Sequence, residues 1–102
     1  MPRIRPEDCP SMAVLRLQID DLDRQLVAAL AERARYIDRA AELKLGAGLP
    51  ARIEARVEEV VANVRRAAGE AGLDRDLAET LWRQLIDWSI RREEAILGEG
   101  PA

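Results

Sequence analysis

The stretch MAVLRLQIDDLDRQLVAALAERARYIDRAAELKL, residues 12–45, decides the fold of this chain. Its 34 residues contain no Gly or Pro, and its apolar side chains recur every three or four positions, which places them in one stripe along a helix. The stripe consists of Leu15, Ile19, Leu22, Leu26, Ala29, Leu30, Ile37, Ala40 and Ala41. The pattern therefore predicts a single long helix with one apolar face.

Two cationic side chains, Arg33 and Lys44, lie in this apolar stripe. They are 11 residues apart, which is about 1100° of helical rotation, so they share a face to within about 20°. Arg16 precedes Arg33 by 17 residues, which leaves it roughly 100° around the helix. Arg16 is therefore able to reach the same site only from another direction.

The length of the chain limits how the long helix is covered. A compact chain of 102 residues has a radius of gyration of about 13 Å. The 34-residue helix is about 50 Å long. The remaining residues are too few to cover the apolar face, so we expect one domain that packs against a partner subunit.

The composition excludes several classes of function. The net charge is −3, with acids and bases interspersed, so the surface offers no basic field for nucleic acid or an anionic membrane. Without His and with Cys9 as the one cysteine, a zinc or haem site and His-dependent catalysis are not expected. Since there is neither a membrane span nor a signal-peptide pattern, we expect a cytoplasmic protein without metal or cofactor.

Composition also marks the two ends of the predicted domain. Residues 1–11 contain three prolines, which disfavour a helix and predict an extended arm, with Ser11 as the N-cap of the long helix. Residues 98–102, GEGPA, predict a disordered tail. The helical domain is accordingly predicted to span residues 12–97.

Two further helices are predicted after the long one. The segment LGAGLP, residues 45–50, predicts a loop. A second helix is expected from about residue 51 to 71, where Gly72 ends it. Asp74 is the predicted N-cap of a third helix that reaches about Leu97.

Further polar side chains lie on or beside the apolar rows of these two helices, namely Arg56, Ser89 and Glu93. Each has a simple structural interpretation, because helix Ser bonds back to its own carbonyl, exposed carboxylates are solvated, and Arg carries its charge outward. Together with the cations of the first helix, they predict a small basic pocket. Since desolvated guanidinium groups need anionic partners, we expect a small anionic ligand and chemistry that depends on positioning and electrostatics.

The first helix resembles the opening helix of the all-helical chorismate mutases. The run LRLQIDDLDRQLVAALAERARYIDRAAELK is similar to the family pattern LR, two residues, IDxLDxxLxxLLxxR, with Lys eleven residues after that Arg. The likeness continues through GLPARIEARVEEVV, GLDRDLAETLW and QLIDWSI and covers about residues 12–97. It implies an all-α, three-helix chain in an intertwined homodimer, which converts chorismate to prephenate by an intramolecular rearrangement without a cofactor.

The resemblance also implies roles for the polar residues. Arg33 would bind one carboxylate of the dianionic substrate, and Arg16 would reach the other carboxylate from the partner chain. Lys44 would hydrogen-bond the ether oxygen of the breaking bond. Arg56 would lie beside the pocket, and Ser89 would contact a carboxylate.

Two positions depart from the mutase pattern. Glu93 stands where most bacterial members have Gln beside the ether oxygen, and Val57 stands where the pattern has a Glu that contacts the ring hydroxyl. A related lyase, which removes pyruvate from isochorismate to make salicylate, also lacks that acid and shares PEDC (residues 6–9) and Trp88. Isochorismate carries its hydroxyl on a different ring carbon, which gives the loss of the acid a physical meaning.

Ser89 and the 12-residue separation of Lys44 and Arg56 are typical of the mutases. We therefore predict a chorismate mutase with a pericyclic mechanism, in which Lys44, Glu93 and Arg33 are catalytic. The alternatives are an isochorismate pyruvate lyase, a mutase of a substituted chorismate, and a non-catalytic helical dimer in which the cations rim a coiled-coil-like seam.

Overall fold

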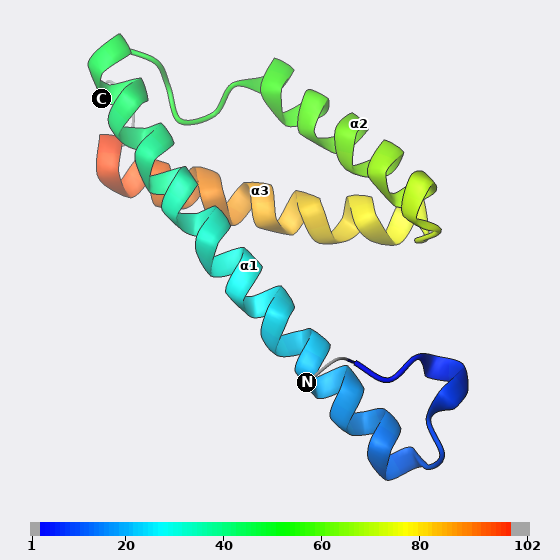
Figure 1. Ribbon diagram of the computed structural model, residues 1–102. Coiled ribbons are helices and arrows are strands. Elements are labelled where there is room, and N and C mark those ends of the chain that lie inside the picture. The colour runs from blue at the N-terminus through cyan, green and yellow to red at the C-terminus, as the bar shows by residue number, and fades with distance from the viewer. Residues whose placement is uncertain (1–2, 99–102) are drawn as a thin grey trace. The chain divides into compact units, whose positions relative to one another are not determined.

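The computed structural model describes residues 3–98 of the chain. They form three α-helices, α1 (Met12–Ala47), α2 (Glu54–Ala71) and α3 (Arg75–Leu97), and one short 3-10 helix, η1 (Pro6–Asp8), without a strand over these residues (Figure 1). The predicted all-α, three-helix chain is confirmed. The C-terminal tail, residues 98–102, is predicted to be disordered. Residues 99–102 of this tail lie outside the described range.

Among residues 3–98, none of the helices combines the length and the hydropathy that a bilayer-spanning segment needs. The chain divides into two compact units, residues 1–35 and residues 36–102, and α1 runs from the first into the second. The two units are considered one after the other.

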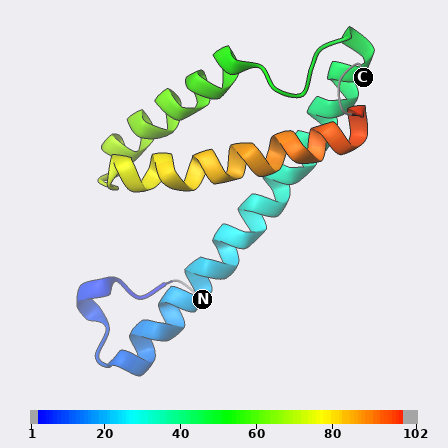
Figure 2. The same cartoon turned by 180° about the vertical axis from the view of Figure 1, so that it is seen from behind.

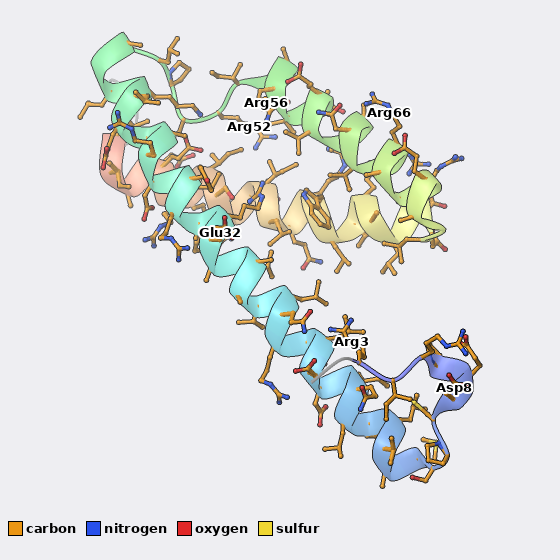
Figure 3. The ribbon with its side chains drawn as sticks, in the orientation of Figure 1. Arg3, Asp8, Glu32, Arg52, Arg56 and Arg66 are labelled. Carbon is orange, nitrogen blue, oxygen red and sulfur yellow. The ribbon has the colours of Figure 1, made fainter. Side chains whose placement is uncertain are left out.

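In the first unit, the N-terminal arm folds back along the start of α1. The backbone N–H of Ile4 donates to Oε1 of Gln18 at 3.0 Å, and Arg3 lies 3.6 Å from the carboxylate of Asp21. Figure 3 labels Arg3 on this arm and Asp8 in η1. The arm was predicted to be extended, but Pro6–Asp8 form the 3-10 turn η1, and residues 3–5 before it have no regular secondary structure.

The start of α1 is capped as the sequence predicts. The hydroxyl of Ser11 accepts a hydrogen bond from the backbone N–H of Val14 at 3.2 Å. Such a bond satisfies one of the amide groups that have no partner in the first turn of a helix. The prediction that Ser11 is the N-cap is confirmed.

The apolar face of α1 remains exposed in this unit, because the arm is the one other segment of the unit. Its large side chains are between 40% and 65% exposed. The members of the apolar stripe in this range are Ile19, Leu22, Leu26 and Leu30. The expectation that one chain is too short to cover the helix agrees with this exposure.

In the second unit, α2 and α3 lie side by side and run in opposite directions (Figures 1 and 2). Their facing sides form the buried core, which consists of Val57, Val61, Ile86 and Ile90. Gly72 ends α2 with φ of 78°, a left-handed conformation that glycine adopts without steric cost. The side chain of Asp74 then accepts from the backbone N–H groups of Asp76 and Leu77, at 2.8 and 3.1 Å, so this N-cap prediction is confirmed.

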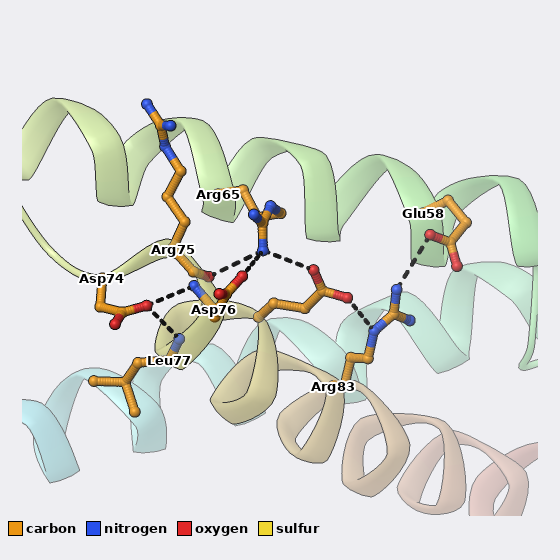
Figure 4. Close-up of polar contacts among 8 residues, drawn as sticks. Glu58, Arg65, Asp74, Arg75, Asp76, Leu77 and Arg83 are labelled. Carbon is orange, nitrogen blue, oxygen red and sulfur yellow. Dashed lines mark hydrogen bonds and ion pairs between the residues drawn. The ribbon is translucent and has the colours of Figure 1, made fainter.

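Ion pairs also connect α2 and α3 (Figure 4). Arg65 of α2 lies 3.0 Å from Asp76 and 3.0 Å from Glu79 of α3. Glu79 in turn lies 2.7 Å from Arg83, which is 3.4 Å from Glu58 of α2. The guanidinium groups lower the pKa of Glu79, with the hydrogen bond from Arg83 as the largest cause.

The loop between α1 and α2 lies three residues later in the sequence than the predicted one. Helix α1 continues through Gly46 to Ala47, and α2 begins at Glu54 instead of residue 51. Gly48 stops α1 because its φ of 68° is left-handed, and the N–H of Leu49 then returns to the carbonyl of Lys44 at 2.9 Å. The loop is thereby placed after Ala47, and α2 starts correspondingly later.

Candidate functional site

The last turns of α1 cross the C-terminal part of α3, and a buried ion pair joins them. Nζ of Lys44 lies 2.7 Å from Oε1 of Glu93, and the two side chains are 19% and 6% exposed. Within residues 3–98, this buried Oε1 accepts no aligned hydrogen bond. The contact with the Lys44 ammonium is therefore an electrostatic one, and it neutralises a carboxylate that is almost removed from water.

Lys44 also contacts the loop that precedes α2. Its ammonium donates to the backbone carbonyl of Ala51 at 2.7 Å. An ammonium group has three N–H donors, and the carbonyl of Ala51 accepts one of them. Lys44 is thus held between the loop and α3 with a donor left for a ligand.

Ser89 lies one turn before Glu93 on α3, and it is buried. Its hydroxyl donates to the backbone carbonyl of Leu85 at 2.7 Å, which is the structural interpretation expected for a Ser within a helix. Because residues four apart share a helix face, Ser89 lies beside the Lys44–Glu93 pair along α3.

The other two predicted residues of this unit are not brought to the Lys44–Glu93 pair. Arg56 is exposed at the start of α2 and pairs with Glu59 of the same helix (Figure 3). Val57 is buried in the core between α2 and α3. An apolar side chain at this position fills the core and supplies no acceptor for a ring hydroxyl.

Arg16 and Arg33 belong to the first unit. Arg16 is exposed on α1, and Arg33 is half-buried. Their proposed contacts with a substrate remain predictions.

Three groups of this unit were not found from the sequence, namely the carbonyl of Ala51 that contacts Lys44 and the paired side chains of Asp38 and Arg92. Arg92 donates through Nε and, at 3.0 Å, through a terminal nitrogen to the two oxygens of Asp38. A hydrogen bond from the Arg92 guanidinium is also the main reason why the pKa of Asp38 lies below its usual value of 3.8. A backbone acceptor leaves no trace in a sequence, and Asp38 is one of 19 acidic residues.

One signal in the composition does point to Lys44. The chain has 16 basic residues, and all except Lys44 are arginine. A compact ammonium on a flexible stem differs from a planar guanidinium in how it reaches a single acceptor. The position of the one lysine therefore marks this side chain as different from the other cations.

A pocket of about 560 Å³ adjoins Lys44 on the side of the loop. Its lining includes Leu49, Arg52, Glu94 and Leu97, but neither Ser89 nor Glu93. In the described part of the chain, no three acidic or cysteine side chains are grouped to hold a metal ion. The candidate functional group of this unit is accordingly the Lys44–Glu93 pair.

Comparisons with known proteins agree with this architecture. The family described as chorismate mutase type II matches residues 15–94. Isochorismate pyruvate lyase of Pseudomonas aeruginosa is 37% identical over 89 residues, which cover 86% of this chain and 86% of that protein. T-protein of Enterobacter agglomerans is 32% identical over 82 residues, which cover 80% of this chain and 22% of that protein. The chain belongs to the chorismate mutase type II family.

Proposed function

We propose that this chain catalyses the rearrangement of chorismate to prephenate. The observation that carries the proposal is the buried Lys44–Glu93 pair at 2.7 Å, at the two positions where the family resemblance implies contacts with the ether oxygen. Family membership supports an enzyme of this general class. Ser89, buried one turn away on α3, is the group we assign to a substrate carboxylate.

The proposed reaction needs no nucleophile and no proton transfer. The carbon–oxygen bond of the enolpyruvyl ether breaks while a carbon–carbon bond forms in the same molecule. Negative charge grows on the ether oxygen, and an N–H donor of Lys44 stabilises it. The proposed site around Lys44, Ser89 and Glu93 also holds the substrate in a compact conformer, so that the reacting atoms are close before the reaction starts.

Glu93 has a different role in each of its two protonation states. An ionised carboxylate accepts hydrogen bonds and does not donate them. In this form, Glu93 holds the Lys44 ammonium in place. In its protonated form, Glu93 donates to the ether oxygen together with Lys44.

We further propose that the active form is a homodimer, to which Arg16 of one chain contributes at the pocket of the other. The exposed apolar face of α1 supports a partner that buries it, since contiguous apolar surface of this kind marks an interaction site. Sedimentation at micromolar concentration is expected to give the mass of a dimer. A monomer of undiminished helicity would contradict the dimer.

A complementation assay tests whether Arg16 acts across the subunits. An Arg16→Ala chain and an Arg33→Ala chain are expected to be inactive as homodimers. After refolding together, they should regain part of the activity, because one pocket of the mixed dimer has both arginines. Mixed dimers without activity would place Arg16 outside the shared pocket.

A second candidate function is the removal of pyruvate from isochorismate to give salicylate. Val57, buried where the mutase pattern has an acid, favours it, as does the similarity to an isochorismate pyruvate lyase along 86% of both chains. Both reactions would use the same cationic side chains, and the two substrates differ in which ring carbon carries the hydroxyl.

Product analysis distinguishes the two candidates. The protein is incubated separately with chorismate and with isochorismate, and the products are identified by chromatography. Prephenate from chorismate supports the mutase, and salicylate from isochorismate supports the lyase. Turnover of neither substrate would contradict both and favour a non-catalytic helical dimer.

A further inference from the structure

Helix α3 carries two neighbouring rows of side chains, and one member of each row pairs with a residue near the end of α1. The first row consists of Ser89 and Glu93, and Glu93 pairs with Lys44. The second row consists of Trp88 and Arg92, and Arg92 pairs with Asp38. The rows are about 100° apart around α3, because each residue of the second row immediately precedes one of the first.

On α1, the two partners of these rows lie on either side of Ala41. Asp38 precedes Ala41 by three residues and Lys44 follows it by three, so each is about 60° from Ala41 around the helix, on opposite sides. Ala41 itself is 0% exposed. The end of α1 is therefore joined to α3 by one ion pair on each side of the buried Ala41.

We propose that Asp38, Arg92 and Trp88 form a positioning unit that fixes the rotation of the α1 end about its axis, so that Lys44 lies against Glu93. This inference rests on the proposed function, because it assigns the unit to the placement of the Lys44 ammonium at the reacting oxygen. None of the three side chains is assigned a contact with the substrate.

The geometry of the unit restricts rotation. Two parallel N–H donors of Arg92 meet the two oxygens of Asp38, and such a paired arrangement requires one relative orientation of the groups. The guanidinium carbon of Arg92 also lies 5.5 Å from the ring centre of Trp88, within the range of a cation–π contact. Arg92 is thereby held by Trp88 of its own helix, α3, while it pairs with Asp38 of α1.

A small rotation would matter for catalysis. A group about 6 Å from the helix axis moves by roughly 2 Å when the helix turns by about 20°. A misplacement of about 1 Å at a reacting centre can cost about 100-fold in rate. Lys44 Nζ needs that precision, whereas binding of the substrate carboxylates by flexible arginines does not.

The test compares kcat and KM of the wild-type protein with those of Asp38→Asn and Arg92→Gln. Each substitution removes one charge of the pair; Asn has the size of Asp, and Gln is a shorter, uncharged polar replacement for Arg. We expect kcat to fall about tenfold or more and KM to change less than about threefold, since an interaction needed only in the transition state is lost. The double variant should be no slower than the slower single variant, because both act through one contact.

Glu42→Gln is the matched control. Glu42 pairs at 2.8 Å with Arg39 of the same helix and is exposed, so its loss leaves the contact with α3 intact. We expect the kcat of this control to equal that of the wild type. Unchanged kcat in both Asp38→Asn and Arg92→Gln, or additive losses in the double variant, would overturn the proposal.

A second readout does not depend on activity. Since Lys44 is the one lysine of the chain, protein labelled with ¹³C,¹⁵N-lysine gives one set of side-chain NMR signals. Asp38→Asn and Arg92→Gln are expected to move these signals toward those of Glu93→Gln, in which the pair is broken, and Glu42→Gln is expected to leave them unchanged. Signals that stay at the wild-type position in the first two variants would refute the positioning role. A wild-type protein inactive on both substrates would instead refute the proposed function.

Discussion

The buried pair of Lys44 and Glu93 leads to a quantitative prediction about stability. Lys44→Met removes the cation and leaves the carboxylate of Glu93, 6% exposed, without its partner. Glu93→Leu removes the carboxylate and leaves the more exposed ammonium, which keeps its hydrogen bond to Ala51. The double variant replaces the pair by two apolar side chains of similar size.

The unfolding free energies of these three variants are expected to fall in a specific order. An uncompensated buried charge costs about 3–5 kcal/mol, whereas replacement of a whole buried pair by apolar side chains is close to neutral. Lys44→Met should therefore lose about 3 kcal/mol of unfolding free energy, the low end of that range, because the lysine side is partly solvated. Glu93→Leu should lose less, and the double variant should be close to the wild type. The coupling energy of the pair is then about 3 kcal/mol or more.

Urea denaturation followed by circular dichroism measures these differences. Protein concentration is held constant, because the stability of a dimer depends on it. The exposed pair of Arg39 and Glu42 serves as the control cycle, with an expected coupling of about 0.5 kcal/mol or less. If the Lys44–Glu93 coupling were as small as that of the control, the pair would be solvated and the geometry assigned to the site would be wrong.

Three further predictions concern the second unit. Ala41→Leu should destabilise the protein by about 1–3 kcal/mol in thermal or urea unfolding, because the larger side chain does not fit a fully buried position. Asp74→Ala should lose about 1 kcal/mol and Asp74→Ser much less, since Ser also caps the two amide groups at the start of α3. The pKa of Glu79 is lowered first by Arg83 and then by Arg65, so this carboxylate stabilises the fold above its ordinary pKa of 4.5 and the contribution disappears as the pH falls through the lowered value. Unfolding measured between about pH 7 and pH 3 should therefore show a smaller acid-induced loss of stability for Glu79→Gln than for the wild type; an equal loss would assign the effect to other carboxylates.

The local structure of the chain was predictable because its signals are local. Three- and four-residue apolar spacing predicts the helices, and the side chains of Ser11 and Asp74 bond to amide groups within three residues of themselves. The family pattern was likewise readable, since it depends on residue types at fixed separations along one helix. The uncovered apolar face of α1 followed from the length of the chain alone.

The boundaries of the loop before α2 were harder to predict from the sequence. The loop was expected to begin at residue 45, but Gly46 is tolerated within α1, and the left-handed Gly48 follows the end of the helix. Which of several glycines adopts the left-handed conformation depends on which neighbouring backbone N–H and carbonyl groups form hydrogen bonds with each other. Leu49 and Lys44 supply those groups, and a composition pattern does not identify them.

By itself, the sequence determined the helices, their caps, the family and a candidate set of site residues, because these depend on spacing along one chain. The tertiary structure alone decided which of those residues meet. It brings Lys44 to Glu93 across 49 positions of sequence, leaves Arg56 exposed beside Glu59, and adds Asp38 and Arg92 as a second contact between the same helices. Distances between helices depend on how their faces pack, and no periodicity within one helix contains that information.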